Sequence, residues 1–128
     1  ILCRTSNPSA GDFQDLMVSS TPLYQIVAQK IRQWNVHNNC GAVVGATYPE
    51  ELKTVRALLG EEIPILIPGV GRQGGDVEKT VRNGTNSHGE MALINSSREI
   101  IFAGDQQDFA EQARKKAVAI RNDINNYR

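Results

Sequence analysis

The chain alternates between two kinds of apolar pattern. Short continuous apolar runs, "ILC", "GAVV", "PILI" and "MALI", recur along it, and runs of this length are typical of strands that are buried on both faces. Each run is followed by a longer segment in which apolar residues return every three or four positions, which is the spacing of one helix face. We therefore expect four strand-helix units, with no linker rich in Pro, Gly or Ser between them.

The expected helices carry signals at their ends or along one face. Thr47 and Glu50 have the spacing of a capping box for the second helix, and Gly60 closes it. Asp76 is a suitable N-cap for the third helix, which we expect to stop at Gly84. The first and fourth helices are predicted from apolar stripes, formed by Leu23, Ile26, Val27, Ile31 and Trp34, and by Phe109, Ala113, Ala117, Ile120 and Ile124.

This alternation predicts an α/β protein with a parallel sheet and helices packed outside it. Four units can form an open doubly wound sheet or half of a (β/α)8 barrel, for which about 250 residues is typical. The residues alone leave both open. In either architecture ligands bind beyond the carboxyl ends of the strands. The segments at those ends are "TSNP", "ATYP", "PGVGRQGG" and "NSSR".

Composition and charge narrow the classes of function. The 128 residues contain 14 basic and 14 acidic side chains, so we expect no electrostatic footprint for nucleic acid or an anionic membrane. No signal-peptide pattern and no membrane-spanning apolar stretch occurs, which favours a cytoplasmic protein. We expect Cys3 and Cys40 to be buried free thiols. Only His37 and His88 accompany them, so no metal site is expected.

The stretch "PGVGRQGGD" at residues 68–76 has two interpretations. Four glycines in nine residues form either a flexible loop or a cradle of backbone N–H groups around an anion. Arg98, directly after the fourth apolar run, is either part of a surface ion pair or a guanidinium that binds a phosphate bidentately. Barrels commonly bind phosphate at the loops after their last two strands and at a short extra helix, here "REIIFA". We therefore favour the cradle, with Arg98 as its cation.

Groups for covalent or proton-transfer chemistry are missing from the expected strand ends. Every lysine falls in an expected helix. Asp12 and Asp15 look like loop and turn residues, and Asp76 serves better as a helix cap. His37 and His88 fall in loops on the opposite side, where a solvated surface role is the simpler interpretation. The sequence thus predicts a binding surface without a catalytic group.

Four motifs, in this order and spacing, resemble a known family: "RTSNPSAGDFQDL", "VVGATYPEEL", "IPGVGRQGGD" and "INSSREIIFA". They are similar to the C-terminal half of bacterial orotidine 5'-phosphate decarboxylase, in the longer subgroup typified by mycobacterial enzymes. The resemblance covers essentially the whole chain. It implies one (β/α)4 half-barrel over residues 1–128, strands five to eight of a TIM (β/α)8 barrel, with the N-terminal half absent. It also implies conversion of orotidine 5'-phosphate to uridine 5'-phosphate in pyrimidine biosynthesis, without cofactor or metal.

The resemblance assigns substrate-binding roles on the pyrimidine side. Ser6 matches the family serine that hydrogen-bonds the amide edge of the base. The segment from Pro68 to Gly71 matches the loop that flanks the base and closes over it.

On the phosphate side, Gln73 matches the glutamine that bridges the phosphate and the pyrimidine. Arg98, with the N–H of Ser97 or its neighbour, matches the phosphate clamp. Arg72 stands where the family often has a small residue. It either adds a cation at the phosphate rim or points to solvent, and we favour the second.

The resemblance also implies what this chain lacks. The family's Asp-Lys-Asp motif, whose lysine protonates the carbanion left by carbon dioxide, belongs to the end of the third strand and does not occur here. We therefore assign no catalytic residue and expect the 128 residues alone to be inactive. The family enzymes are dimers in which the partner contributes an aspartate. A half-barrel exposes two strand edges and an apolar inner face, so we expect pairing with the N-terminal half-barrel or with a second copy.

Two alternatives remain open at this stage. A sugar-phosphate decarboxylase or aldolase of the same suprafamily would share the phosphate grip without needing a pyrimidine contact at Ser6. A non-catalytic phosphate- or nucleotide-binding half-barrel fits if the chain is complete as written.

Overall fold

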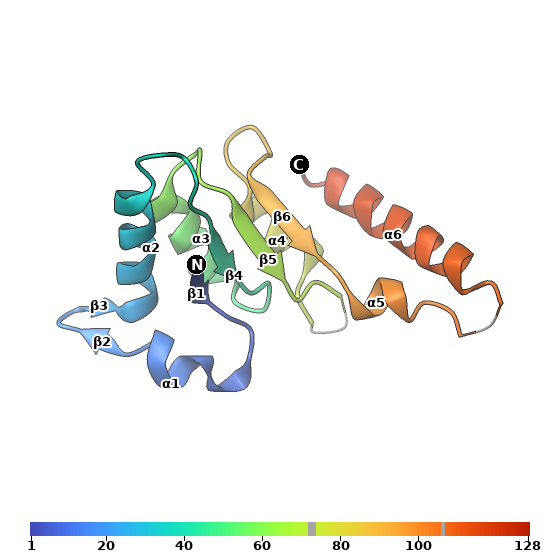
Figure 1. Ribbon diagram of the computed structural model, residues 1–128, viewed down its shortest axis with the longest axis horizontal. Coiled ribbons are helices and arrows are strands. Elements are labelled where there is room, and N and C mark those ends of the chain that lie inside the picture. Colours follow the sequence, from blue (N-terminus) through green and yellow to red (C-terminus); the bar gives the residue numbers. More distant parts are fainter. Residues whose placement is uncertain (72–73, 106) are drawn as a thin grey trace.

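The computed structural model describes residues 1–71, 74–105 and 107–128. Its main sheet has four parallel strands, each hydrogen-bonded to the next along the chain. These strands are β1 (Leu2–Arg4), β4 (Ala42–Val44), β5 (Ile65–Pro68) and β6 (Ala92–Asn95). A main helix follows each of them: α2 (Leu23–Trp34), α3 (Pro49–Leu59), α4 (Val77–Gly84) and α6 (Phe109–Asn125). The four expected strand-helix units are confirmed (Figure 1).

Shorter elements fill the connections. The segment between β1 and α2 contains a 3-10 helix, η1 (Pro8–Ala10), a helical turn, α1 (Gly11–Gln14), and an antiparallel pair of strands, β2 (Met17–Val18) and β3 (Thr21–Pro22). None of these was expected from the sequence. The short helix α5 (Arg98–Ile101) lies between β6 and α6, where the sequence analysis expected it.

The strand order decides between the two architectures that the sequence left open. A doubly wound sheet reverses its strand order at a switch point and has helices on both faces. Here the order β1-β4-β5-β6 follows the chain without reversal. Helix α2 packs on α3 and α3 on α4, and α3 and α4 lie behind the sheet in Figure 1. This is the singly wound arrangement of a barrel. The chain has the fold of half a (β/α)8 barrel.

One face of the sheet forms the core. Cys3, Val44, Ile65 and Ile67 are buried on it, at most 1% exposed, beneath the helices. They pack with buried side chains of α2 and α3, namely Ala28, Ile31, Leu52, Val55 and Leu59. Each strand thus places alternate apolar residues against the helix layer, as the period of two in a strand requires.

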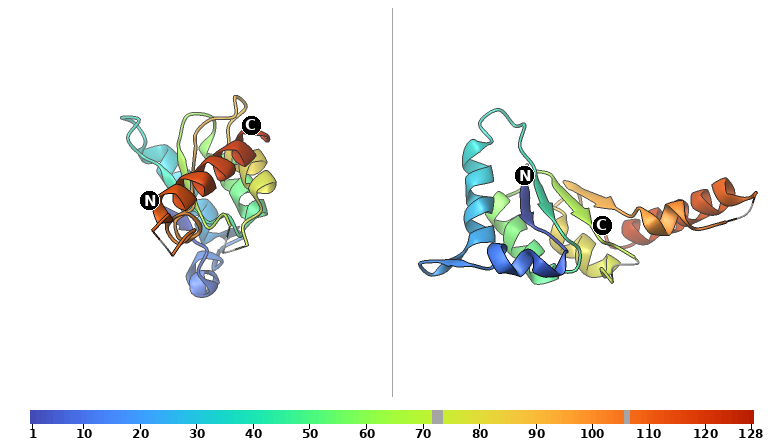
Figure 2. Two further views of the ribbon diagram at one scale, coloured as in Figure 1. Left: turned by 90° about the vertical axis from the view of Figure 1, so that its right-hand side faces the viewer. Right: turned by 60° about the horizontal axis from the view of Figure 1, so that its bottom comes forward.

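The opposite face, which we call the bare face, carries one apolar residue from each strand. Leu2, Val43, Leu66 and Leu93 are aligned across the sheet by strand register. The three leucines are 66%, 41% and 59% exposed. The expectation that the apolar runs are buried on both faces is therefore wrong for this chain, because none of its described segments covers the bare face (Figure 2).

The helix ends follow the sequence signals in part. Asp76 is the N-cap of α4, and its carboxylate accepts a hydrogen bond from the backbone N–H of Lys79 at 2.9 Å. Gly60 ends α3 with φ at 78°. The capping box at Thr47 is wrong. Pro49 takes the first helical position of α3, so the helix begins one residue later than a cap at Thr47 requires.

A buried arginine forms hydrogen bonds with several loops at the edge of the sheet where the strands begin. Arg56 of α3 donates hydrogen bonds of 2.7 to 3.0 Å to the carbonyl groups of Gly84, Gly60, Ile63 and Met91. It is 8% exposed, and burial lowers the pKa of its guanidinium. Arg56 thus supplies donors that these turn carbonyls lack within secondary structure.

The two cysteines are free, as expected, but they are not equally buried. Cys3 lies in the core and Cys40 is half-buried, in the loop before β4. Burial raises the pKa of the Cys3 thiol to about 11. In the part of the chain that the structure describes, no helix has the length and apolar character needed to cross a membrane.

Candidate functional site

The loops that follow the four parallel strands meet at the carboxyl edge of the sheet. Neighbouring loops are hydrogen-bonded to strand ends, since Gly45 N–H donates to Arg4 O at 2.7 Å and Ala46 N–H donates to Pro68 O at 2.8 Å. A Cβ placed on Gly45 would lie 2.7 Å from the Cβ of Ser6. The approach of these loops therefore depends on glycine at position 45.

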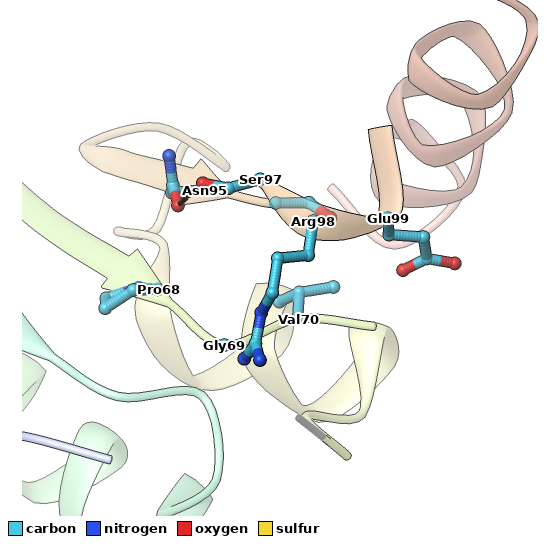
Figure 3. A pocket seen from close by; sticks show the side chains of 8 residues that line it. Pro68, Gly69, Val70, Asn95, Ser97, Arg98 and Glu99 are labelled. Carbon is cyan, nitrogen blue, oxygen red and sulfur yellow. Dashed lines mark hydrogen bonds between the residues drawn. The ribbon is translucent and has the colours of Figure 1, made fainter. Parts of the chain in front are cut away.

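A small cavity lies between the ends of β5 and β6. It has a volume of about 70 Å³ and is lined by Pro68, Gly69, Val70, Asn95, Ser96, Ser97, Arg98 and Glu99. Figure 3 shows Arg98 reaching from the start of α5 across to Gly69 and Val70, while Glu99 points away from it. Arg98 is exposed and forms no ion pair with any described residue. The surface ion pair considered for Arg98 is therefore not present among these residues.

Three described glycines of the run have positive φ values, and all three take part in backbone hydrogen bonds across the loop. Gly69, Gly71 and Gly74 have φ values of 101°, 89° and 84°, which are accessible to glycine at little cost. Gly74 N–H donates to Gly71 O at 2.8 Å, and Gly75 N–H donates to Gly69 O at 3.2 Å. Backbone N–H groups in such turns make anion-binding concavities. The expected roles of Arg72 and Gln73 lie outside the described residues.

A carboxylate packs beside this turn, and the sequence analysis did not single it out. A Cβ on Gly71 would overlap the Glu99 carboxylate. Glu99 is paired with Lys116 of α6 at 2.5 Å, so its negative charge next to the cavity is balanced. Glu99 is therefore a structural neighbour of the turn. Position 71 favours glycine because of its φ, whereas the flexible end of Glu99 could move away from a larger side chain.

Two hydroxyl groups at this edge lack hydrogen-bond partners among the described residues. They are Ser96 Oγ, which lines the cavity beside Arg98, and Thr47 Oγ1, in the loop after β4. Buried polar atoms are nearly always paired within a folded protein. Thr80 Oγ1 in α4 is likewise unpaired in the described part of the chain, so these atoms do not by themselves identify a binding region.

The expected substrate residues divide between separate hollows. Pro68, Ser97 and Arg98 line the small cavity. Ser6 lines another, of about 370 Å³, together with Asn7, Pro8 and Thr47. Gly71 faces a third, of about 320 Å³, toward α6. The structure thus brings Pro68 together with Ser97 and Arg98, and it places Ser6 beyond β4, on the same edge of the sheet.

Lysine and histidine side chains lie away from the strand ends. Every lysine lies in a helix, as expected. His37 and His88 lie in the loops that precede β4 and β6, on the opposite edge. No group of three or more His, Cys, Asp or Glu side chains that could hold a metal ion occurs in residues 1–71, 74–105 and 107–128. The described part of this edge therefore presents no lysine or histidine that could act as a general acid.

Comparison with known proteins settles the family. The model of the orotidine 5'-phosphate decarboxylase / HUMPS family matches residues 1–113. The chain belongs to this family. The resemblance that the four motifs carried is confirmed, with the (β/α)8-type fold that it implied.

Individual members of the orotidine 5'-phosphate decarboxylase family are similar along the entire chain. The orotidine 5'-phosphate decarboxylase of Cupriavidus metallidurans is 50% identical over 129 residues, which is 100% of this chain and 47% of the relative. That of an Azoarcus species is 51% identical with the same coverage. This chain spans about half the length of the curated relatives it matches.

Solved structures agree with the family assignment. Leishmania donovani UMP synthase superposes with a TM-score of 0.88 at 38% identity, over 99% of this chain and 27% of that one. A putative orotidine-monophosphate-decarboxylase from Toxoplasma gondii superposes with a TM-score of 0.80 at 31% identity, over 98% of this chain and 50% of that one.

Proposed function

We propose that this chain supplies the pyrimidine- and phosphate-binding half of an orotidine 5'-phosphate decarboxylase, which releases carbon dioxide from orotidine 5'-phosphate to form uridine 5'-phosphate. The observation that carries the proposal is the Arg98 guanidinium, which has no ion-pair partner among the described residues and spans the cavity between the ends of β5 and β6. Barrels bind phosphate at this place, between the loops after their last two strands.

The two ends of the nucleotide are assigned to different strand ends. Arg98 and the backbone N–H of Ser97 hold the phosphate, and Gln73 bridges it to the base. Ser6 bonds the amide edge of the pyrimidine. In support, Arg98 and Ser6 lie on the same edge of the sheet but line different cavities, as the distant phosphate and base of one nucleotide require.

The segment from Pro68 to Gly71 lies between these two ends and flanks the base. Its glycines allow the backbone to approach a ligand closely, because no side chain stands in the way. Closure of this segment over the substrate would exclude water and hold the base against Ser6.

The chemical step falls to residues outside this chain. Breaking the bond to the carboxylate leaves a carbanion, which needs nearby charge to stabilise it and an acid to protonate it. The lysines of this chain lie in its helices. We assign the acid to an Asp-Lys-Asp motif in the N-terminal half of the barrel. Phosphate binding at Arg98 then contributes remote binding energy to the reaction. The proposal needs neither a cofactor nor a metal.

The bare face supports a partner in the same barrel. Leu2, Leu66 and Leu93 expose an apolar row across the sheet, and a closed barrel fills its interior with such residues. We propose that strands one to four of the barrel pair with this chain and that the complete barrels form a homodimer. A second copy of this chain is the alternative partner.

A hybrid protein tests the proposal. This chain replaces the matching 129 residues of the Cupriavidus metallidurans relative, and the formation of uridine 5'-phosphate is measured. We expect the hybrid to decarboxylate orotidine 5'-phosphate and the 128 residues alone to be inactive. A folded hybrid that neither turns over nor binds uridine 5'-phosphate overturns the proposal. Turnover by the 128 residues alone contradicts the assignment of the chemical step.

One rival substrate class follows from the name of the family, which covers more than the decarboxylase. A decarboxylase or aldolase acting on a sugar phosphate needs the Arg98 site but not Ser6. Calorimetric titration of the hybrid with uridine 5'-phosphate and with ribulose 5-phosphate separates the two. Preference for the nucleotide, lost in Ser6→Ala, supports the pyrimidine assignment.

A further inference from the structure

A buried arginine lies beneath the loop that carries Ser6. Arg4 is the last residue of β1, two positions before Ser6, and is only 2% exposed. Sequence reasoning passed over it, although a charged residue at the end of a buried apolar strand is unusual. A cation buried at this place needs a physical reason, because removing it from water costs several kcal/mol.

The contacts of Arg4 join two loops at the carboxyl edge. Its Nη2 lies 3.0 Å from Asp15 Oδ2, and its Nη1 donates to Thr5 O at 3.1 Å. Its Cζ lies 3.8 Å from the ring centroid of Tyr48. Thr5 and Asp15 belong to the loop after β1, whereas Tyr48 belongs to the loop after β4. The planar guanidinium can make the fork of hydrogen bonds and the stacking contact at once, which an ammonium cannot.

A set of hydrogen bonds around Arg4 also fixes the residue directly before Ser6. Thr5 N–H donates to Gln14 Oε1 at 2.8 Å, and Gln14 Nε2 donates to Thr5 Oγ1 at 3.0 Å. Gln14 Oε1 also lies 3.4 Å from Nη1 of Arg4. Thr5, directly before Ser6, is thereby held on its backbone N–H, its carbonyl and its hydroxyl. On the far side, Ser6 packs so closely on the Gly45 backbone that a Cβ at position 45 would lie 2.7 Å from the Ser6 Cβ.

Stability alone does not account for a cation here. The Arg4 Nε atom is buried without a hydrogen-bond partner among the described residues, and Asp15 is half exposed, so the pairing is incomplete. Replacing a buried ion pair by an apolar side chain is often neutral or stabilising. What an apolar side chain cannot supply is directional contact to the loops after β1 and β4 at once.

We infer that Arg4 is a positioning residue, which holds Ser6 at the distance and angle that recognition of a pyrimidine amide edge requires. The inference rests on the proposed function, because Ser6 is assigned to the base there. It makes Arg4, Asp15 and Tyr48 one unit that sets specificity for the base. The phosphate site around Arg98 follows β6, which β4 and β5 separate from β1, and it does not depend on that unit.

Two inhibitors separate the base contact from the phosphate contact in the active hybrid. Uridine 5'-phosphate can make both the base contact and the phosphate contact, whereas ribose 5-phosphate has no base and can make only the phosphate contact. We expect Arg4→Lys to raise the inhibition constant of uridine 5'-phosphate about tenfold, roughly the loss of one well-placed hydrogen bond. The inhibition constant of ribose 5-phosphate should change by less than about twofold. Asp15→Asn, at a half-exposed position that folding tolerates better, should act in the same direction but less strongly.

Arg56 provides the matched control, because it is also buried but lies on the opposite edge. Arg56→Lys should lower the midpoint of thermal unfolding without changing either inhibition constant. If both inhibition constants rise by the same factor in Arg4→Lys, Arg4 supports the whole fold and the inference is overturned. If the inhibition constant of uridine 5'-phosphate is unchanged in Arg4→Lys and in Asp15→Asn, the inference is overturned and the proposed function still holds. An original hybrid that does not bind uridine 5'-phosphate overturns the proposed function and the inference together.

Discussion

The two faces of the sheet come from the same apolar runs but have opposite surroundings. In β5, Ile65 and Ile67 are completely buried under the helices, whereas Leu66 between them is 41% exposed. The same contrast holds between Cys3 and Leu2 in β1. Continuous apolar runs therefore predict strands and at least one covered face. They do not show whether this chain covers one face of its sheet or both.

The largest effect is expected when a charge is placed on the covered face. Ile67→Asp puts an unpaired carboxylate into the core, which costs several kcal/mol, enough to unfold a domain of ordinary stability. Circular dichroism during urea unfolding measures the loss.

Leu66→Asp, one residue away on the bare face, is the matched control. In the 128 residues alone it should change the free energy of unfolding by no more than about 0.5 kcal/mol, as exposed positions do. In the hybrid it should prevent folding of the complete barrel. Equal effects of the two substitutions on the 128 residues would show that the two faces do not differ in this way.

Arg98 lies at the carboxyl edge of the sheet and belongs to neither face. Its loss should therefore weaken ligand binding without lowering the stability of the fold. Arg98→Ala in the hybrid should weaken uridine 5'-phosphate binding by roughly 10- to 100-fold, since charge-assisted hydrogen bonds contribute about 1.5 to 3 kcal/mol. The unfolding midpoint should stay the same, because the side chain is exposed. Calorimetry measures the affinity. Lys116→Ala, which removes only the partner of Glu99, should change binding much less.

The smallest effect concerns the Cys3 thiol on the covered face. Burial raises its pKa from 9.0 to about 11, so the folded state favours the neutral thiol. This stabilisation is fully present below pH 9 and is lost as the pH rises toward 11, by roughly 1 kcal/mol between pH 9 and 10. Urea unfolding at both pH values measures the loss.

Cys3→Ala should remove this part of the pH dependence, whereas Cys40→Ala should keep it. In the unmodified chain, iodoacetamide at pH 8 should alkylate half-buried Cys40 well before Cys3, because the thiolate is the reactive form. Faster alkylation of Cys3 would contradict its placement on the covered face.

Local signals predicted several features correctly because their physical cause is local. Asp76 caps α4 and Gly60 ends α3 through contacts within a few residues of themselves. The capping box at Thr47 was wrong because α3 begins at Pro49, which makes Tyr48 the N-cap residue. The η1, α1 and β2–β3 segment was missed, since elements of two to four residues leave no periodic pattern to detect.

The candidate site was predictable only in part. Arg98 was found because it closely follows the apolar run that forms β6. Arg4, Tyr48 and Glu99 were not, because their contacts join residues from different loops or helices, at distances that spacing along the chain does not encode. The assignment of Gln73 stays a prediction.

The amino-acid sequence by itself determined the four strand-helix units, their family and the strand ends at which polar residues gather, because apolar period, caps and motifs are written in neighbouring residues. The tertiary structure alone decided that the strands follow one another without reversal, that a single sheet face is covered, and that Arg4 joins the loops after β1 and β4. These features depend on contacts between segments far apart in the chain, which only packing in three dimensions establishes.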